Sequence, residues 1–302
     1  MRRERRPHPP PGYRTIRTSR ALAWVDAAPS REEIEAWVSE ALFEGRTLYE
    51  AAAAGPGPGT PPGKFLGRLP LFVVERGDQQ SIVRRYSRGG AIAPILGDRY
   101  LRAGTPRPFH ELLASRVVGE AGIRTPRVLA AAMYPSGAFY RGDLVTEFAA
   151  GTMDLAALLF GSTGGAATEV RGVGSAAGPT APPSATAIDD VRTRALVAAV
   201  ELIGVLASRG IQHADLNAKN ILVTAGDPEM LHLLDLDRCR TGLRPSLRLH
   251  LRMTARLRRS LARWEAHSGC PLARQEWEAF DNACHVSMTP DMGRGSDGTS
   301  HG

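Results

Sequence analysis

Cysteine and long apolar runs are both scarce in this 302-residue sequence. The three cysteines include no C-x-x-C pair, so neither a disulfide framework nor a structural zinc site is indicated, and we expect a reducing cytoplasm. A membrane-spanning helix needs about 18 uninterrupted apolar residues, whereas the longest candidate, residues 195–207, contains Glu201. The basic N-terminus is followed by prolines rather than by an apolar stretch, so a secretory signal is not expected.

Lysine is almost missing as well. Lys64 and Lys219 are the only two lysines, and arginine supplies all the other basic residues of a chain with a net charge of +7. A positive excess is compatible with anionic partners. Abundant Arg, Ala, Gly and Pro are also typical of a GC-rich genome, so the charge by itself is weak evidence for function.

The chain changes character near its midpoint. Residues 19–150 contain short β-rich runs, with a turn signal at Gly77-Asp78 between two of them, and one or two helices. Residues 151–285 contain a helical pattern over 188–208 and arginine-rich helices after it. We therefore predict an α+β fold with two lobes, a small β-rich N-lobe and an α-rich C-lobe, with a cleft between them.

Three segments lack the periodicity of packed elements. Residues 1–18, which are basic and proline-rich, and residues 286–302 are predicted to be disordered tails. Residues 161–187, rich in Gly, Ala, Thr and Pro, are predicted to form a flexible insertion in the C-lobe.

Ser30 and Glu33 have the spacing of a capping box and predict a helix. Its apolar residues would be Ile34, Trp37, Val38, Ala41 and Leu42.

The most informative stretch begins at Gly210 and reads G-I-Q-H-A-D-L-N-A-K-N-I-L-V. After a turn, a second apolar run ends at Asp235-Leu-Asp237. If Asp215 precedes one strand and Asp235 ends the next, both carboxylates and the amide of Asn220 lie at the same edge. Such oxygen ligands suit Mg²⁺, which takes one or two carboxylates from the protein and the rest of its ligands from phosphates and water.

This pattern, H-x-D-L-N-x-x-N followed by an apolar strand ending in D-x-D, resembles the catalytic loop and metal-binding segment of the protein-kinase fold. In this form it resembles the lipopolysaccharide kinases, most closely those acting on 3-deoxy-D-manno-octulosonic acid (Kdo). In protein kinases the Asp accepts the proton of the substrate hydroxyl and the Asn holds metal. The resemblance implies Asp215 as catalytic base, with His213 and Asn217 beside it in the loop, and Asn220 and Asp235 as Mg²⁺ ligands.

The resemblance continues upstream in the same order and covers roughly residues 64–264. It rests on four upstream segments, at residues 82–90, 96–101, 109–113 and 138–147, and on residues 255–261 downstream.

The same resemblance implies a nucleotide site for ATP. In the kinase fold a strand lysine pairs with a helix glutamate and reaches the phosphates, and Arg84 and Glu111 occupy those positions. Arginine supplies the same charge with a different geometry. Glu147 belongs to the segment implied to meet adenine. The phosphate-covering loop is expected around Gly67, although the sequence there is not G-x-G-x-x-G. Lys219 is either a solvated loop residue or a contact of the γ-phosphate.

Arginines recur along a predicted helix at 244–263, and two interpretations of them stay open. One is a solvated face with salt bridges. The other is an anionic surface, since basic helices are drawn to acidic lipid and arginine binds phosphate and carboxylate bidentately. A nucleic-acid partner is not expected, because interleaved aromatics and a recognisable binding motif are missing. The arginines are Arg244, Arg248, Arg252 and Arg256, with Arg259 and Arg263 beyond.

Taken as a resemblance, the sequence implies ATP-dependent phosphorylation of a Kdo hydroxyl, the 4-hydroxyl, on Kdo-lipid A. The implied place is the cytoplasmic face of a Gram-negative inner membrane, bound peripherally. The motif does not identify the acceptor sugar, so a heptose kinase or another small-molecule phosphotransferase is one alternative. A non-catalytic pseudokinase scaffold is a second alternative. A regulatory protein kinase is less expected, because the stretch after Asp235 is short. Serine hydrolase and zinc protease motifs, G-x-S-x-G and H-E-x-x-H, do not occur.

Overall fold

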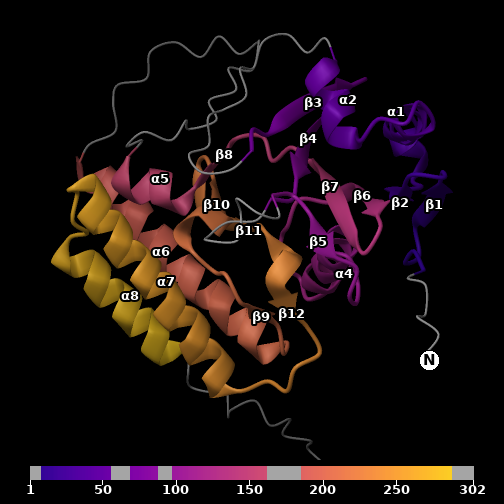
Figure 1. Ribbon diagram of the computed structural model, residues 1–302. Coiled ribbons are helices and arrows are strands. Elements are labelled where there is room, and N and C mark those ends of the chain that lie inside the picture. The colour runs from indigo at the N-terminus through magenta and orange to yellow at the C-terminus, as the bar shows by residue number, and fades with distance from the viewer. Residues whose placement is uncertain (1–7, 56–68, 88–96, 162–184, 288–302) are drawn as a thin grey trace, which may run out of the picture.

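The computed structural model of the protein describes residues 8–55, 69–87, 97–161 and 185–287. Within these ranges the N-terminal half is mainly β-sheet and the C-terminal half mainly helical (Figure 1). The mixed α and β composition predicted from the sequence is therefore confirmed, whereas the division into a small N-lobe and a C-lobe stays a prediction.

One antiparallel sheet forms most of the N-terminal half. Its seven strands are β1 (Tyr13–Arg17), β2 (Leu22–Asp26), β3 (Phe72–Arg76), β4 (Gln79–Arg85), β5 (Tyr100–Leu101), β6 (Val128–Ser136) and β7 (Phe139–Glu147). The order is β1-β2-β6-β7-β4-β3, and β5 pairs with β7. The hairpin predicted at Gly77-Asp78 is confirmed, with Gly77 at a φ of 56° between β3 and β4.

Both faces of this sheet are covered. Three helices pack on it: α1 (Glu32–Phe43), α2 (Leu48–Ala54) and α4 (Arg107–Glu120). Strand β2 shows the division, because alternate residues of a strand point to opposite faces. Ala23 and Val25 lie in the core with α1 and α2, whereas Leu22 and Trp24 lie in the core with α4. The sheet is thus held between two apolar layers, which fixes the strand that carries Arg84.

The disordered tail predicted for residues 1–18 is wrong for part of its length. Residues 13–17 form the edge strand β1, which pairs with β2 along its whole length. The hydroxyl of Tyr13 also donates a hydrogen bond to the carbonyl of Val128. The strand depends on pairing with β2 rather than on its own residue pattern. The surrounding charged and proline-rich sequence therefore predicted disorder.

The capping box predicted at Ser30 and Glu33 does not form. Ser30 lies in a short 3₁₀ turn, and Arg31, the N-cap residue of α1, makes no side-chain cap bond. The five apolar residues predicted for this helix are buried as expected. A capping box is present instead in α2, between Thr47 and Glu50.

The C-terminal half contains the helices α5 (Leu155–Phe160), α6 (Ala185–Ser208), α7 (Leu247–Ser268) and α8 (Arg274–Val286). Helix α6 lies side by side with α7 and α8 (Figure 1), and the three enclose an apolar core that includes Leu196, Ile203, Leu257 and Phe280. Five short strands carry the loops beside this core: β8 (Thr152–Asp154), β9 (Gln212–His213), β10 (Ile221–Thr224), β11 (Asp227–Leu233) and β12 (Cys239–Arg240). They pair in the orders β11-β10-β8 and β12-β9.

Several segment boundaries differ from those expected. Helix α6 begins at Ala185 rather than at 188, so the end of the expected insertion at 161–187 is helical. Helix α7 begins at Leu247, so Arg244 precedes it. Residues 162–184 and 288–302 lie outside the described residues. In the part of the chain that the structure describes, no helix is long and apolar enough to cross a membrane.

Candidate active site

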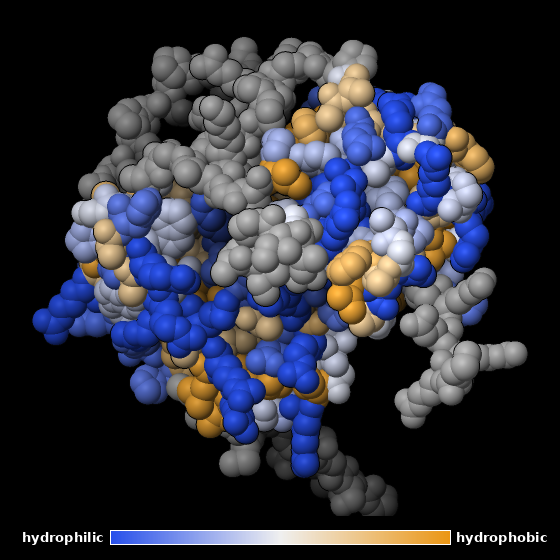
Figure 2. All heavy atoms as spheres, viewed as in Figure 1, coloured by the Kyte–Doolittle hydropathy of each residue, from blue (hydrophilic) through white to orange (hydrophobic). Residues whose placement is uncertain are grey.

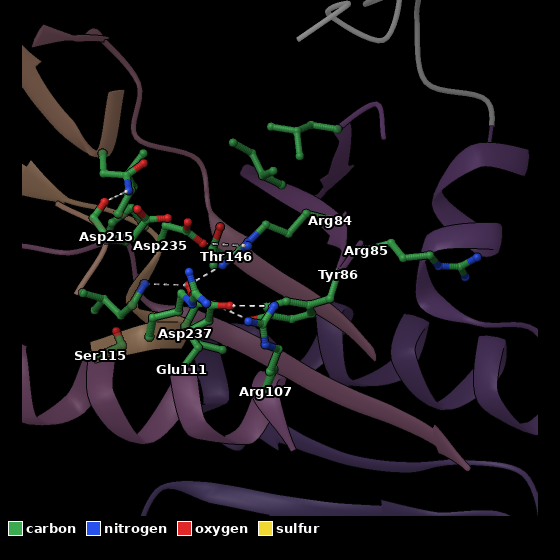
Figure 3. Close-up of a pocket in the computed structure, with 18 of the residues that line it drawn as sticks. Arg84, Arg85, Tyr86, Arg107, Glu111, Ser115, Thr146, Asp215, Asp235 and Asp237 are labelled. Carbon is green, nitrogen blue, oxygen red and sulfur yellow. Dashed lines mark hydrogen bonds and ion pairs between the residues drawn. The ribbon is translucent and has the colours of Figure 1, made fainter. Parts of the chain in front are cut away.

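A cavity of about 550 Å³ lies where the large sheet, α4 and the loops after β9 and β11 meet. One end is mainly apolar, and its lining includes Leu69, Leu71, Ile82 and Val128. The other end is polar and charged, and Figure 3 shows side chains from β4, α4 and both loops pointing toward one another there. The polar lining includes Arg84, Arg107, Glu111, Asp215, Asn220, Asp235 and Asp237.

His213 connects the two loops that carry the predicted catalytic and metal-binding residues. Its Nε2 lies 2.9 Å from the carbonyl oxygen of Leu234, and its Nδ1 accepts the backbone N–H of Asp215 at 3.2 Å. A neutral ring with the proton on Nε2 satisfies both partners. Burial lowers the pKa of His213, which keeps the ring in this neutral form. The role predicted for His213, orienting the loop, fits this geometry.

Two asparagines fold the loop around the main chain of Asp215. The side-chain amides of Asn217 and Asn220 each donate to the carbonyl oxygen of Asp215, at 2.9 Å in both cases. The side-chain oxygen of Asn217 also accepts the backbone N–H of Lys219 at 2.9 Å. Asn217 therefore shapes the loop with both ends of its side chain. Asn220 uses its amide nitrogen in the loop, which leaves its side-chain oxygen as a possible ligand.

Asp235 occupies a strained backbone conformation at the end of the second loop. Its φ of 59° makes it the one non-glycine residue with a positive φ among the residues that the structure describes. Such left-handed positions cost energy and cluster at functional sites. The backbone N–H of the preceding Leu234 donates to the carbonyl of Asn220 at 2.8 Å. A main-chain hydrogen bond therefore joins the two segments that contain the predicted metal ligands, Asn220 and Asp235.

The donor set at this point fits Mg²⁺. Asp235 offers a carboxylate and Asn220 an amide oxygen, and both line the cavity. No three His, Cys, Asp or Glu side chains come together as a metal cage within the described ranges. Mg²⁺ does not require such a cage, because it usually keeps waters and binds one or two carboxylates plus substrate phosphates.

The pairing predicted for Arg84 and Glu111 is confirmed. An Arg84 Nη donates to the carboxylate of Glu111, and the other Nη lies 3.3 Å from Asp235. Glu111 is buried, and it also accepts bonds from the hydroxyl of Tyr86 and the backbone N–H of Leu236. Burial acts to lower the pKa of Arg84, but the negative groups around the guanidinium, Glu111 first among them, together raise the pKa above its ordinary value. The arginine therefore stays charged in the cavity.

A second ion pair closes the polar end. An Nη of Arg107 on α4 lies 3.2 Å from the carboxylate of Asp237. Burial, with a further contribution from the charge of Asp235, raises the pKa of Asp237 to about 6, although Arg107 acts in the opposite direction. Sequence reasoning missed Arg107, because its partner lies far away in the chain and no motif links them.

The structure does not bring every predicted site residue into the cavity. Thr146 lines it, whereas the side chain of Glu147 forms an ion pair with Arg31 and borders a different cavity. The ammonium group of Lys219 lies 4.8 Å from the centre of the Trp264 ring, outside the lining of this cavity. Gly67 and the phosphate-covering loop predicted around it lie outside the described residues.

The arginine stripe on α7 supplies a contact that the sequence did not reveal. Arg256 forms an ion pair with the carboxylate of Asp215. Its spacing from the other arginines predicted a common helix face, but only the packing of α7 against the catalytic loop shows that this arginine reaches the predicted base.

Comparison with known proteins places the chain among lipopolysaccharide kinases. Residues 66–173 and 183–283 match the model of the lipopolysaccharide kinase (Kdo/WaaP) family. A 3-deoxy-D-manno-octulosonic acid kinase from Xanthomonas oryzae pv. oryzae is 29% identical over 223 residues, covering 73% of this chain and 77% of that protein. The corresponding kinase of Xanthomonas euvesicatoria pv. vesicatoria is 33% identical over 197 residues, covering 65% and 67%.

The Vibrio cholerae 3-deoxy-D-manno-octulosonic acid kinase is 25% identical over 179 residues, which cover 59% of this chain and 64% of that protein. The similarity therefore spans less than two thirds of the Vibrio protein. A solved structure described as WaaP in complex with acyl carrier protein has 21% identity and a TM-score of 0.46, covering 85% of this chain and 86% of that one. Because the family model matches more than half of its length, the chain belongs to the lipopolysaccharide kinase (Kdo/WaaP) family.

Proposed function

We propose that the protein is an ATP-dependent kinase of a two-lobed, protein-kinase-like fold that phosphorylates a hydroxyl of Kdo, the 4-hydroxyl, in Kdo-lipid A. One observation carries the proposal: Asp215, Asn220 and Asp235 come from two separate segments and meet at the polar end of a single cavity of about 550 Å³. The names of the curated relatives support Kdo as the acceptor.

The two ends of the cavity match the two parts of a nucleotide. The apolar walls beside Ile82 and Val128 offer a slot for the adenine ring, with Thr146 at its border. The triphosphate would lie toward Arg84, whose guanidinium group is held in position by its ion pair with Glu111. Mg²⁺ held by Asn220 and Asp235 would neutralise charge on the phosphates when it is bound.

Phosphoryl transfer then needs a positioned hydroxyl and a proton acceptor. The acceptor oxygen forms a bond to the γ-phosphorus while the bond from that phosphorus to the ADP oxygen breaks. The hydroxyl proton passes to the carboxylate of Asp215, whose main chain is held in place by the contacts with His213 and the two asparagines. Positioning supplies much of the rate enhancement in such reactions, and a general base contributes about 10²–10⁴-fold.

The start of α7 supports peripheral contact with the acidic cytoplasmic face of a Gram-negative inner membrane. Leu247 and Leu251 are exposed there, 54% and 47% respectively, and alternate with the exposed Arg248 and Arg252. Figure 2 shows hydrophobic and hydrophilic atoms side by side at the lower edge of the molecule, where α7 begins in Figure 1. Apolar residues among arginines are typical of surfaces that lie in a lipid interface.

The acceptor is tested by competition. Wild-type enzyme receives ATP labelled in the γ-phosphate, Mg²⁺, and equal amounts of Kdo-lipid A and a heptosylated core, and the position of phosphate in the product is read by NMR. We expect label on the Kdo 4-hydroxyl. Label only on heptose would make the protein a heptose kinase, and ATP binding without transfer to any acceptor would favour a pseudokinase scaffold.

A further inference from the structure

A second cavity, of about 490 Å³, lies beside the catalytic loop and has no role in the nucleotide site described above. Its walls come from that loop and from one face of α7. Asp215 is the one described residue that lines both cavities. A base that takes the proton of an acceptor hydroxyl must reach both the acceptor and the phosphorus under attack, and a residue between two cavities meets that requirement.

The face of α7 that borders this cavity follows helical spacing. Arg256, Ser260, Trp264 and His267 lie three or four residues apart, so their side chains share one side of the helix. Arg263, next to Trp264, completes this wall.

The second cavity is strongly cationic. Lys219, Arg256 and Arg263 line it, and Asp215 is its one carboxylate among the described residues. Arg256 is paired with Asp215, but its Nε is buried without an acceptor in the described part of the chain. Arg263 bonds only to the carbonyl of Arg259, at 3.4 Å, and has no carboxylate partner among the described residues. The cavity therefore holds more positive charge than its own residues neutralise.

Trp264 gives this cavity a flat apolar surface between its charges. The Lys219 ammonium group lies 4.8 Å from the centre of the Trp264 ring, and the ring of His267 lies 5.8 Å away, edge-on. An aromatic face can pack against the C–H groups of a sugar ring, while guanidinium groups bind carboxylates bidentately. The volume lies within the usual range of about 300–1,000 Å³ for small-molecule sites.

We infer that the second cavity binds the acceptor as an acidic sugar, with its carboxylate on Arg263 and Lys219 and its ring against Trp264. The hydroxyl to be phosphorylated then faces Asp215, and ATP enters from the other side. Arg256 is a positioning residue that holds the Asp215 carboxylate between the two ligands. This inference rests on the proposed function and adds to it the group by which the acceptor is recognised.

Steady-state kinetics on a detergent-solubilised Kdo acceptor test the inference without a membrane. The variant is Arg263→Gln, and the matched control is Arg259→Gln, which removes the same charge from an exposed position on the same helix outside both cavities. Because a hydrogen-bonded ion pair to substrate is lost, Arg263→Gln should raise the KM for the acceptor about tenfold or more. The kcat and the KM for ATP should stay near those of Arg259→Gln.

A second arm identifies the recognised group. An acceptor whose carboxylate is converted to a neutral amide should lose about tenfold in kcat/KM with the wild-type enzyme and much less with Arg263→Gln, because the partner is already gone. An equal loss in both enzymes would overturn the inference. So would a loss that follows removal of lipid phosphates rather than of the carboxylate, since the lipid phosphates would then be the bound anion.

The two proposals fail in different ways. If the wild-type enzyme transfers phosphate to no Kdo acceptor, the proposed function is wrong and this inference falls with it. If the wild-type enzyme transfers phosphate but Arg263→Gln behaves like Arg259→Gln, the proposed function stands and the acceptor cavity alone is wrong.

Discussion

At the scale of single residues, charged groups in the cavity are held in arrangements that stability alone does not favour. Asp235 has a left-handed backbone, and its carboxylate lies near a second one on Asp237, whose pKa it helps to raise. Glu111 is buried and gathers bonds from three partners. Strained backbone conformations and perturbed pKa values of this kind are typical of catalytic and binding sites.

The backbone of Asp235 leads to a prediction in which stability and activity separate. A left-handed conformation costs a non-glycine residue about 1 kcal/mol, and a partly exposed ion pair such as that with Arg84 contributes about 0–1 kcal/mol. Asp235→Gly should therefore leave the free energy of unfolding within about 1 kcal/mol of wild type. Phosphate transfer should fall by at least about 100-fold, because a ligand is lost for the Mg²⁺ that would neutralise charge on the phosphates. Urea unfolding and a labelled-ATP assay measure the two effects, and an active variant would exclude Asp235 as a metal ligand.

The raised pKa of Asp237 predicts a pH dependence of stability. Its folded-state pKa of about 6 lies above the unfolded value, so the folded protein binds this proton more tightly and loses stability as pH rises from about 4 to 6. Asp237→Asn removes this decline, because the amide does not titrate. The difference in free energy of unfolding, variant minus wild type, should therefore rise by about 2 kcal/mol from pH 4 to pH 7. Denaturant titrations at several pH values measure the difference, and two parallel stability curves would contradict the assignment.

At the scale of elements, the predicted catalytic loop, residues 210–220, is held at both ends by neighbouring segments. Gly210, at its start, has a φ of 65°, and its carbonyl accepts the backbone N–H of Leu243, just before α7. A side chain at this position would collide with the Leu243 carbonyl. At the other end, Ala218 donates its N–H to the buried hydroxyl of Ser260 on α7. The loop and α7 therefore form one unit, which is how Arg256 reaches Asp215.

Two alanine substitutions test how closely these segments pack. Gly210→Ala should destabilise the protein by about 2–4 kcal/mol, since it combines a left-handed φ with a backbone collision. Gly226→Ala is the matched control, because Gly226 also has a positive φ, 81°, but open space around it, and it should cost only about 1 kcal/mol. Thermal or urea unfolding gives both values, and equal losses would mean that the contact with Leu243 is loose.

At the scale of the whole molecule, the sequence predicted local motifs better than long-range contacts. The H-x-D-L-N-x-x-N spacing was enough to locate Asp215 and Asn220, and the resemblance was enough to pair Arg84 with Glu111. The contact of Arg256 with Asp215 was not predictable, because it depends on how α7 packs against the loop.

The N-terminal region shows the same limit. The apolar spacing of α1 predicted its buried face correctly, but the strand in residues 13–17 has no local signal and exists because β2 and β6 extend the sheet toward it. This region precedes the family match, which begins at residue 66. Its helices α1 and α2 nevertheless complete the core on one face of the sheet that carries Arg84.

In the proposed reaction, Asp215 accepts the proton of a sugar hydroxyl during phosphate transfer from ATP. The most direct test compares wild type with Asp215→Asn, which keeps the shape of the side chain but not its basicity, for Mg²⁺-dependent transfer of labelled γ-phosphate to Kdo-lipid A. We expect kcat to fall by about 10²–10⁴-fold while ATP still binds with wild-type affinity. Transfer by Asp215→Asn at the wild-type rate would exclude Asp215 as the base.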